Sequence, residues 1–420
     1  MFARLKDTLH DTLRWSETYT KTDMLYMTHG GFWLSLAKGV GLFSSLLFAV
    51  AMANLIPPEV FGTYKFVLSG AAIIGAFSLT GMGAAITQAV ARGFEGALQE
   101  GTRAYFKWSW GVIGISIAVA IYYFINDNFV LAISFLIAGA CSPIITGFSF
   151  FAQFISGKKD FRTQALYDSV RNVTPAAVLI LTIFLTRDPI LIILAYFVSS
   201  ALCNFLLHLS TVQRYRPNER VDPDTVVYGK HASVTGILAK VAEQVDKVLV
   251  FHYLGAAQLA VYAFAQTPIN NLKLLNDIPS RLALPKLSAR GLPELQESLP
   301  RKVFLLVGIM LVIAIIYIVA APFVFRLLFP QYLDAIVFTQ ILAISLIFAP
   351  GSMFNEALTA HLKKREMYIS QTVLPVTRIA LLIVLLPLYG IWGAVGALIV
   401  SQALMFALAG FLFWQAKHEA

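Results

Sequence analysis

The chain has 420 residues, of which 58% are hydrophobic and only 13% charged, and its net charge is +9. A soluble domain usually carries about 25% charged residues, so this composition excludes a soluble globular protein and predicts an integral membrane protein. Both cysteines, Cys141 and Cys203, lie in apolar runs without metal-type neighbours. We therefore expect two buried free thiols, no metal site and no cofactor.

The first 30 residues lack the long apolar core of a signal peptide. At helical spacing they form an apolar stripe of Phe2, Leu5, Leu9 and Leu13, opposed by Arg4, Lys6 and Arg14. This pattern is typical of an amphipathic helix lying on the cytoplasmic leaflet. A solvated tail is the alternative.

Twelve stretches approach the roughly 20 apolar residues that a membrane helix needs. They lie at 31–55, 64–91, 105–124, 129–155, 168–186, 189–212, 232–253, 258–285, 303–329, 332–360, 367–388 and 391–414. The seventh and eighth carry several charges, so they depend partly on the internal repeat described below. Pro268, Pro279 and Pro285 are expected to interrupt the eighth. The chain is thus predicted to be an all-α membrane protein with twelve transmembrane helices.

Basic residues set the predicted orientation, because they concentrate in cytoplasmic loops. With a cytoplasmic N-terminus, 22 of the 32 Lys and Arg residues fall in cytoplasmic segments. The opposite side then holds only Arg187 and Arg326. We expect both termini to be cytoplasmic.

A polar inter-lobe loop at 213–230 divides the chain into two sets of six spans, an N-lobe at 31–212 and a C-lobe at 231–420. A shift of 198 residues aligns Phe61-Gly62-Thr63-Tyr64 with Leu259-Ala260-Val261-Tyr262, and Ala91-Arg92 with Ala289-Arg290. An even number of spans in each half gives both lobes the same orientation. Transporters built from such repeats often bind their substrate between them.

Charges within the predicted spans indicate a polar path through the bundle. Each costs about 2.5–3.5 kcal/mol at mid-helix on insertion scales, so it usually faces a water-filled cavity or a partner. Eight are basic and five acidic, a net balance of +3. They are Lys38, Lys65, Arg171, Lys240, Lys247, Lys273, Arg281 and Arg378, and Asp168, Glu243, Asp246, Asp277 and Glu356.

Two plus–minus–plus patterns occur in spans seven and eight. Lys240, Glu243 and Lys247 fall at i, i+3 and i+7, whereas Lys273, Asp277 and Arg281 fall at i, i+4 and i+8. Each set therefore shares one helix face. Glu243–Lys247 and Asp277–Arg281 could instead be structural i, i+4 pairs, although each set would leave one base unmatched. We predict a cationic cavity, with Lys38, Lys240, Lys247, Lys273, Arg281 and Arg378 as its candidate substrate-binding residues.

Other readings stay open for several of these residues. Lys38 and Lys65 could extend to the interface from near the ends of their spans. Arg171 could pair with Asp168 at the end of span five, and Arg378 could pair with Glu356 across helices. A buried carboxylate could carry a coupling proton, and the candidates are Glu243, Asp246, Asp277 and Glu356. Asp246 could also be a structural bond to the neighbouring helix.

Two segments resemble a known family. Residues 246–255 (DKVLVFHYLG) with 259–265 (LAVYAFA) are similar to the seventh-to-eighth-helix signature of Wzx-type polysaccharide flippases. Residues 55–64 (LIPPEVFGTY) resemble the N-terminal signature of the same family. These flippases belong to the MOP exporter superfamily, with the MATE and MurJ-like proteins. The span count and chain length extend the resemblance to nearly the whole sequence.

The resemblance implies two parallel six-helix lobes that alternate access to a central cavity. It also implies a polyprenyl-diphosphate-linked oligosaccharide, such as an O-antigen unit, carried from the cytoplasmic to the outer leaflet of a bacterial inner membrane. Membrane lipids, and a polymerase or other polysaccharide-assembly proteins, would be its partners, and nucleic acid would not. The net basic spans suit a diphosphate, since moving an unshielded anion through hydrocarbon costs tens of kcal/mol by Born estimates.

Other classes of protein fit the sequence less well. No predicted outer loop exceeds about ten residues and no clustered His or carboxylate motif lies outside the spans, so we do not expect an enzyme. The chain has no GxxxxGK[ST] phosphate-binding loop, which disfavours ATP-driven transport by this chain alone. The alternative is a MATE-like, ion-coupled drug exporter, for which an acidic or aromatic cavity would be expected.

Overall fold

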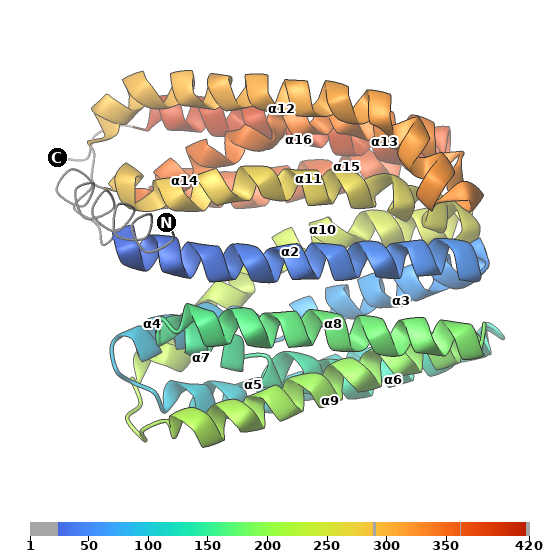
Figure 1. Cartoon of the computed structure of the whole chain (residues 1–420), viewed down its shortest axis with the longest axis horizontal. Coiled ribbons are helices and arrows are strands. Elements are labelled where there is room, and N and C mark those ends of the chain that lie inside the picture. Colours follow the sequence, from blue (N-terminus) through green and yellow to red (C-terminus); the bar gives the residue numbers. More distant parts are fainter. Residues whose placement is uncertain (1–23, 289–290, 362, 417–420) are drawn as a thin grey trace, which may run out of the picture.

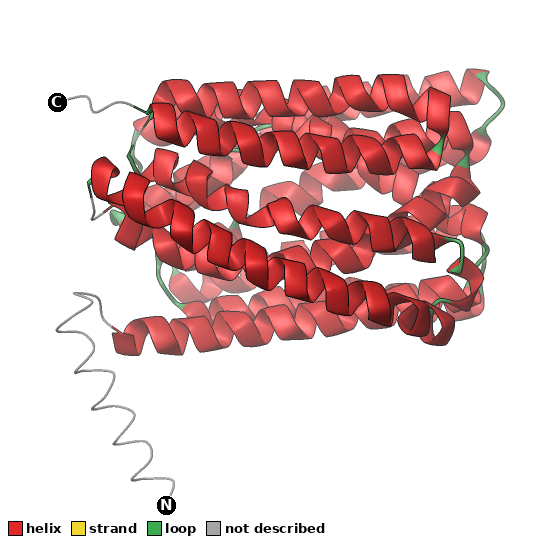
Figure 2. Ribbon diagram, turned by 90° about the horizontal axis from the view of Figure 1, so that it is seen from above, coloured by secondary structure: helices red, strands yellow, loops and turns green. Residues whose placement is uncertain are grey.

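The computed structural model describes residues 24–288, 291–361 and 363–416. In this part of the chain the regular structure is entirely helical, with the helices running roughly along one direction (Figures 1 and 2). The predicted amphipathic segment lies almost wholly outside the described residues, as does the Ala289-Arg290 pair of the repeat. The described chain begins and finishes at the same end of the bundle, here called the termini end (Figure 1).

The first half of the chain forms the N-lobe. Its helices are α2 (Met24–Leu55), α3 (Pro58–Ala76), α4 (Met82–Ala91), α5 (Ala97–Ile125), α6 (Phe129–Phe148), α7 (Phe151–Gly157), α8 (Phe161–Leu185) and α9 (Pro189–Tyr215). Three begin with a side-chain cap that satisfies a free backbone N–H group. Asn128 accepts from Leu131 at α6, Asp160 from Thr163 at α8, and Asp188 from Ile190 at α9.

The second half forms the C-lobe. Its elements are α10 (Asp224–Leu254), α11 (Ala256–Ser288), α12 (Leu292–Leu328), η1 (Pro330–Tyr332), α13 (Ala335–Ala343), η2 (Ile344–Gly351), α14 (Ser352–Ala360), α15 (Lys364–Tyr389) and α16 (Ile391–Gln415). Gly255, with φ +85°, and Gly390, with φ +57°, make the tight turns before α11 and α16. Glycine adopts this left-handed backbone without the steric cost of a side chain.

The helices follow the predicted spans with local differences. Spans 64–91 and 129–155 are each broken into two helices, and span 332–360 into a series of short α and 3-10 segments. Nine helical segments of the described chain are long and apolar enough to cross a membrane. The charged helices α10 and α11 are not among them. The expected interruption of span eight is wrong, because the backbone of α11 stays helical through all three prolines.

The inter-lobe loop is shorter than expected, since α9 continues to Tyr215 and α10 begins at Asp224. Polar contacts fix this loop to the termini end of the N-lobe. Lys158 pairs with Glu95 at 2.5 Å, and Glu95 also accepts from the backbone N–H of Asn218 at 3.1 Å. Arg92 pairs with Asp222 at 2.5 Å. The loop and the N-lobe are thus held together as one unit.

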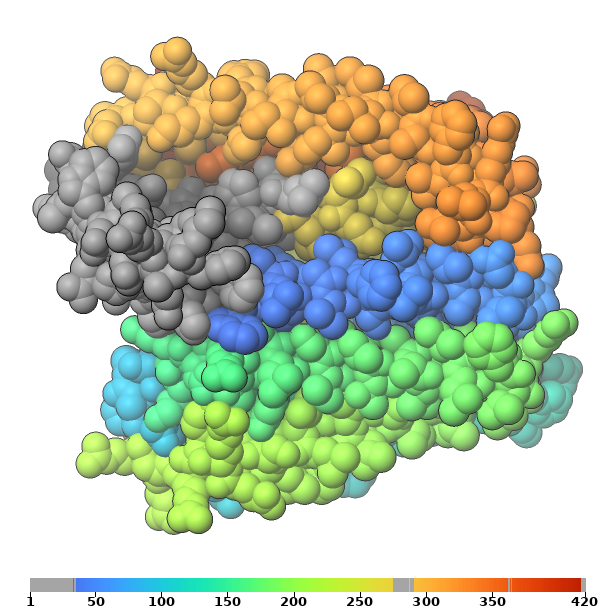
Figure 3. Space-filling view, viewed as in Figure 1, coloured from blue at the N-terminus to red at the C-terminus, as the bar shows by residue number. Residues whose placement is uncertain are grey.

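The lobes meet tightly at the end opposite the termini. The rings of Phe66 and Phe251 stack with centroids 3.9 Å apart, and those of Phe61 and Phe264 stack at 4.5 Å. A Cβ atom at Gly62 would lie 1.8 Å from the carbonyl oxygen of Ala256, so only glycine allows this approach of α3 to α11. Between α2 and α12, by contrast, the surface is recessed, and part of α11 forms the floor of the recess (Figure 3). The lobes are therefore closed at the end away from the termini.

Candidate functional site

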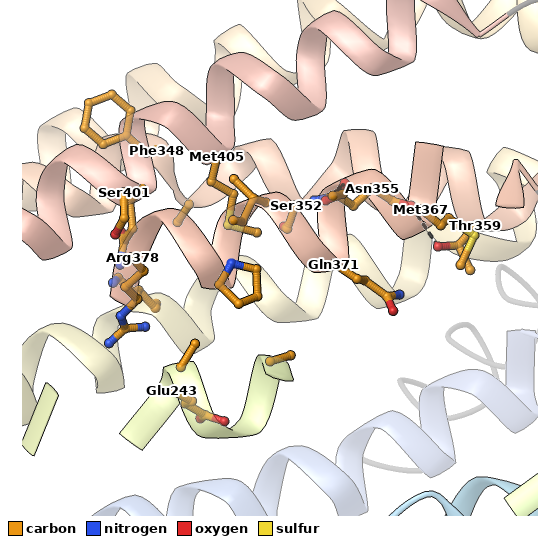
Figure 4. Close-up of a pocket in the computed structure, with 18 residues that line it drawn as sticks. Glu243, Phe348, Ser352, Asn355, Thr359, Met367, Gln371, Arg378, Ser401 and Met405 are labelled. Atoms are coloured by element: carbon orange, nitrogen blue, oxygen red, sulfur yellow. Dashed lines mark hydrogen bonds between the residues drawn. The ribbon is translucent and has the colours of Figure 1, made fainter. Parts of the chain in front are cut away.

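A cavity of about 480 Å³ lies inside the C-lobe, between α10, α11, α15, α16 and the η2–α14 segment. Lys273 and Arg378 supply its basic groups, and Glu243 its only acidic one among the described side chains. Its other polar lining consists of Ser352, Asn355, Thr359, Ser370, Gln371, Ser401 and Gln402. Arg378 extends from α15 toward α10, the helix that carries Glu243 (Figure 4). The lining therefore has an excess of positive charge.

Asp246 stands behind this cavity at the centre of a polar network. Its side chain is 1% exposed. Oδ2 accepts hydrogen bonds from Tyr262, Gln266 and Arg378, each at 3.0 Å. Oδ1 accepts from the backbone N–H of Lys247 at 2.8 Å and lies 3.8 Å from the Nζ atom of the same residue. The network joins three helices, α10, α11 and α15.

Both carboxylate oxygens of Asp246 accept hydrogen bonds in this environment. A buried carboxylate without partners would be very unfavourable, whereas one with several donors and an ion pair is compensated. The buried Nε atom of Arg378 has no hydrogen-bond partner among the residues that the structure describes. Arg378 thus lines the cavity while its guanidinium group is held by Asp246.

A second cavity, of about 460 Å³, lies inside the N-lobe. Its basic residue, Arg171, lies 3.6 Å from Asp168, so the charge is paired. Most of the polar lining is neutral, namely Ser44, Ser45, Thr146, Ser149, Asn172, Ser200 and Asn204. The aromatic rings of Phe48, Tyr64 and Tyr196 complete it.

The two cavities occupy equivalent places in the internal repeat. Gly41, Ser44 and Ser45 line the N-lobe cavity, and the residues 198 positions later, Ala239, Ala242 and Glu243, line the C-lobe cavity. Seven further pairs of lining residues correspond with shifts of 200 to 203. They are Arg171 and Gln371, Pro175 and Pro375, Ser200 and Ser401, Asn204 and Met405, Ile145 and Phe348, Thr146 and Ala349, and Ser149 and Ser352. Parallel repeats place such equivalent sites at the same depth of the bundle.

The Asp246 network is present in one lobe only. With the 198-residue shift, Tyr262 corresponds to Tyr64, Asp246 to Phe48, and Gln266 to Leu68. In the N-lobe the rings of Phe48 and Tyr64 pack edge to face, with centroids 6.1 Å apart. In the N-lobe an aromatic contact therefore takes the place of the buried charges.

The predicted site residues are only partly brought together. The C-lobe cavity is lined by Lys273, Arg378 and Glu243. Lys247 does not line it but lies 3.8 Å from Asp246, the partner of Arg378. Lys240 is exposed one turn before Glu243, and Glu356 is half-buried on α14 outside both linings. The side chains of Asp277 and Arg281 lie outside the described ones. No ion pair joins Lys240, Glu243 and Lys247 among the side chains that the structure describes.

The residues outside those two patterns also have definite places. Lys38 is exposed on α2, three residues before Gly41, and is not among the described residues that line the N-lobe cavity. The Nζ atom of Lys65 lies 5.3 Å from the ring centroid of Phe61. Arg378 pairs with Asp246 rather than with Glu356. Sequence reasoning missed the neutral N-lobe cavity, although the 198-residue shift would have set Ser44 and Ser45 against Ala242 and Glu243.

Comparison with known proteins gives a consistent family and fold. A family model described as "Polysaccharide biosynthesis protein" matches residues 27–289, which is more than half of the chain. No curated protein matches the sequence.

Several solved structures share the fold at low identity. An inward-facing multidrug resistance MATE family transporter of the MOP superfamily is 14% identical, with a TM-score of 0.63 over 89% of this chain and 94% of that one. An outward-facing form is 13% identical, with a TM-score of 0.59 over 92% and 94%. Lipid II flippase MurJ in an inward closed conformation is 14% identical, with a TM-score of 0.59 over 90% and 86%. The chain is therefore a multi-pass membrane protein with a MOP transporter fold.

Proposed function

Because the chain belongs to the polysaccharide biosynthesis protein family, we propose that it is a flippase for a polyprenyl-diphosphate-linked oligosaccharide. It would carry this substrate from the cytoplasmic to the outer leaflet of a bacterial inner membrane, for the synthesis of a surface polysaccharide such as O-antigen. In this proposal both termini are cytoplasmic, and a polymerase and other assembly proteins receive the product.

The observation that carries the proposal is the net positive lining of the C-lobe cavity. Lys273 and Arg378 outnumber Glu243 in the lining, and the excess remains when the network behind it is counted, because Lys247 offsets Asp246, the buried partner of Arg378. A guanidinium can hold phosphate oxygens through two parallel hydrogen bonds, and an ammonium adds a mobile point charge. Together they would replace the hydration that a diphosphate loses inside the membrane. The polyprenyl tail could stay in the bilayer while the headgroup passes between the lobes.

The closed end of the bundle sets the direction of access. Phe66 and Phe251, and Phe61 and Phe264, seal the lobes away from the termini. With cytoplasmic termini this seal lies at the outer face, so the substrate would load from the cytoplasmic leaflet. Release would require the aromatic pairs to separate as the lobes rock.

Among the described carboxylates, Glu243 is the best candidate for ion coupling. It is exposed and lines the cavity, so a proton bound there could be exchanged when the substrate enters. Asp246 is a weaker candidate because its oxygens already accept from Tyr262, Gln266 and Arg378. A MATE-like exporter of cationic drugs is the second candidate function, and Glu243 is the residue that favours it.

Deletion of the gene in its own host separates the two functions. The flippase proposal predicts loss of one surface polysaccharide and accumulation of its lipid-diphosphate-linked unit on the cytoplasmic leaflet. Unchanged surface glycan together with new sensitivity to cationic drugs would contradict the proposal and favour the exporter. Complementation with Arg378→Gln should fail to restore the polysaccharide.

A further inference from the structure

Both cavities have hydroxyl and amide side chains in their linings, but the N-lobe cavity has them at three places where its C-lobe counterpart is apolar. Where the C-lobe has Ala242 and Ala349, the N-lobe has the hydroxyl-bearing Ser44 and Thr146. Where the C-lobe has Met405, the N-lobe has Asn204. The C-lobe thus has small or apolar side chains at the places where these hydroxyl and amide groups lie in the N-lobe.

Asn204 is the most informative of these residues. It is only 3% exposed, on α9, and its Nδ2 atom donates to the backbone oxygen of Ser200 at 2.8 Å. Its buried Oδ1 atom has no hydrogen-bond partner in the described part of the chain. Leaving a buried acceptor unpaired costs about 1–3 kcal/mol. Because Asn204 lines the cavity, a rotation of its side-chain amide toward the cavity would allow Oδ1 to accept a hydrogen bond from a ligand.

The charge of the cavity limits what that ligand can be. Its basic residue, Arg171, is paired with Asp168, and its remaining polar groups are amides and hydroxyls. Amides and hydroxyls both donate and accept, as the hydroxyl groups of a sugar require, whereas Lys and Arg only donate. Tyr196 and Phe48 add aromatic surface against which the apolar face of a sugar ring can pack. The volume of about 460 Å³ is within the range of small-ligand sites.

We propose that the N-lobe cavity binds the sugar part of the substrate while the C-lobe cavity binds its diphosphate. This inference rests on the proposed function and assigns a different part of the substrate to each lobe. Asn204 and Asn172 would contact sugar hydroxyls, and Lys273 and Arg378 the phosphates. Because equivalent cavities lie at the same depth, one headgroup could engage both when the lobes surround it.

Binding of two probes by the purified full chain in nanodiscs tests the division. One probe is undecaprenyl diphosphate without sugar; the other is the lipid-linked oligosaccharide extracted from the host strain lacking the gene. The wild type should bind the glycosylated probe at least about tenfold more tightly. Asn204→Leu should reduce that advantage by about three- to tenfold, the loss of one hydrogen bond. Its affinity for undecaprenyl diphosphate should stay unchanged, which also shows that the variant is folded.

Two further variants keep the test decisive. Asn172→Ala changes an exposed residue of the same cavity, so it serves if Asn204→Leu does not fold. Ser134→Ala removes a buried hydroxyl that bonds within its own helix and does not line the cavity, and it should change neither affinity.

The outcomes distinguish this inference from the function on which it rests. Equal affinity of the wild type for both probes, or an undiminished sugar advantage in both cavity variants, would overturn the inference and leave the flippase proposal standing. Failure of the wild type to bind either probe, or absence of accumulated lipid-linked oligosaccharide in the deletion strain, would overturn both.

Discussion

The Nη2 atom of Arg378 lies 3.0 Å from Oδ2 of Asp246, which joins α15 to α10 by an ion pair whose acidic partner is fully buried. The pair is confined to the C-lobe, since the N-lobe has Phe48 at the place of Asp246. Asp246 therefore holds the guanidinium group of Arg378 at the edge of the cavity.

Removal of the acid alone should be strongly destabilising. Asp246→Leu leaves the Arg378 charge without its counter-ion, and breaking a buried pair in this way typically costs about 3–5 kcal/mol. Unfolding of the purified protein in detergent by denaturant measures the loss. The double variant Asp246→Leu/Arg378→Leu should recover most of the stability and still fail to transport. A single variant as stable as the wild type would show that the pair is not structural.

The basic lining should determine affinity for the diphosphate. Lys273→Gln removes one charge from the cavity wall, and a hydrogen bond to a charged group is worth about 1.5–3 kcal/mol. We expect affinity for undecaprenyl diphosphate to fall by about ten- to a hundredfold. Lys302→Gln, which changes an exposed base on α12 outside the cavity, is the matched control. Equal affinities for both variants would remove Lys273 from the binding site.

Gly62 should be indispensable for closing the lobes away from the termini. A Cβ there would meet the carbonyl oxygen of Ala256, whereas one at Gly75 on the same helix meets nothing within 4 Å. Gly62→Ala should therefore hold this end open, and Gly75→Ala should not. Spin labels at Arg187 and Asp334, in a background without the two native cysteines, report the separation. An unchanged distance in Gly62→Ala would contradict the described closure.

The contacts of Glu95 should make the inter-lobe loop sensitive to acid. The hydrogen bond from Lys158, reinforced by the backbone N–H of Asn218, lowers the pKa of the Glu95 carboxyl below its usual value. A lowered folded-state pKa means that the contact contributes fully above the unfolded pKa and is lost as the pH falls through the folded one. Protection of the loop amides against hydrogen exchange should fall over that interval.

A substitution separates this contact from general acid effects. Glu95→Gln should reduce protection of residues 216–223 by about two- to fivefold already at neutral pH, as for the loss of an exposed ion pair. Glu219→Gln, at an exposed position of the same loop, should not. If the protection of both variants equals that of the wild type, the Lys158–Glu95 pair does not hold the loop.

Much of the architecture could be predicted because membrane helices leave a strong trace in composition. The apolar stretches locate the helices, and the 198-residue shift found from Tyr64 and Tyr262 also relates Ser45 to Glu243 in the cavity linings. Helix ends were less predictable. The break between α3 and α4 contains no proline, whereas the prolines of α11 do not break its backbone.

The partners of the charges were largely unpredictable. Helical spacing identifies neighbours within one helix, and it suggested the Arg171–Asp168 pair, which is confirmed at 3.6 Å. Arg378 and Asp246 are 132 residues apart, so their contact depends on how α15 packs against α10. Within α10, Lys247 donates to the side-chain Oε1 of Gln244, three residues earlier, at 3.0 Å and does not pair with Glu243.

Movement of a diphosphate-linked oligosaccharide across a membrane by this chain can be measured in vesicles. The most direct measurement reconstitutes the purified protein into vesicles containing labelled lipid-linked oligosaccharide from the deletion strain. A membrane-impermeant enzyme that cleaves the sugar then reports the fraction exposed outside. We expect wild-type protein to make the inner-leaflet pool accessible, and Arg378→Gln protein, incorporated to the same level, not to do so. Equal accessibility in wild-type vesicles and in protein-free vesicles would contradict the account.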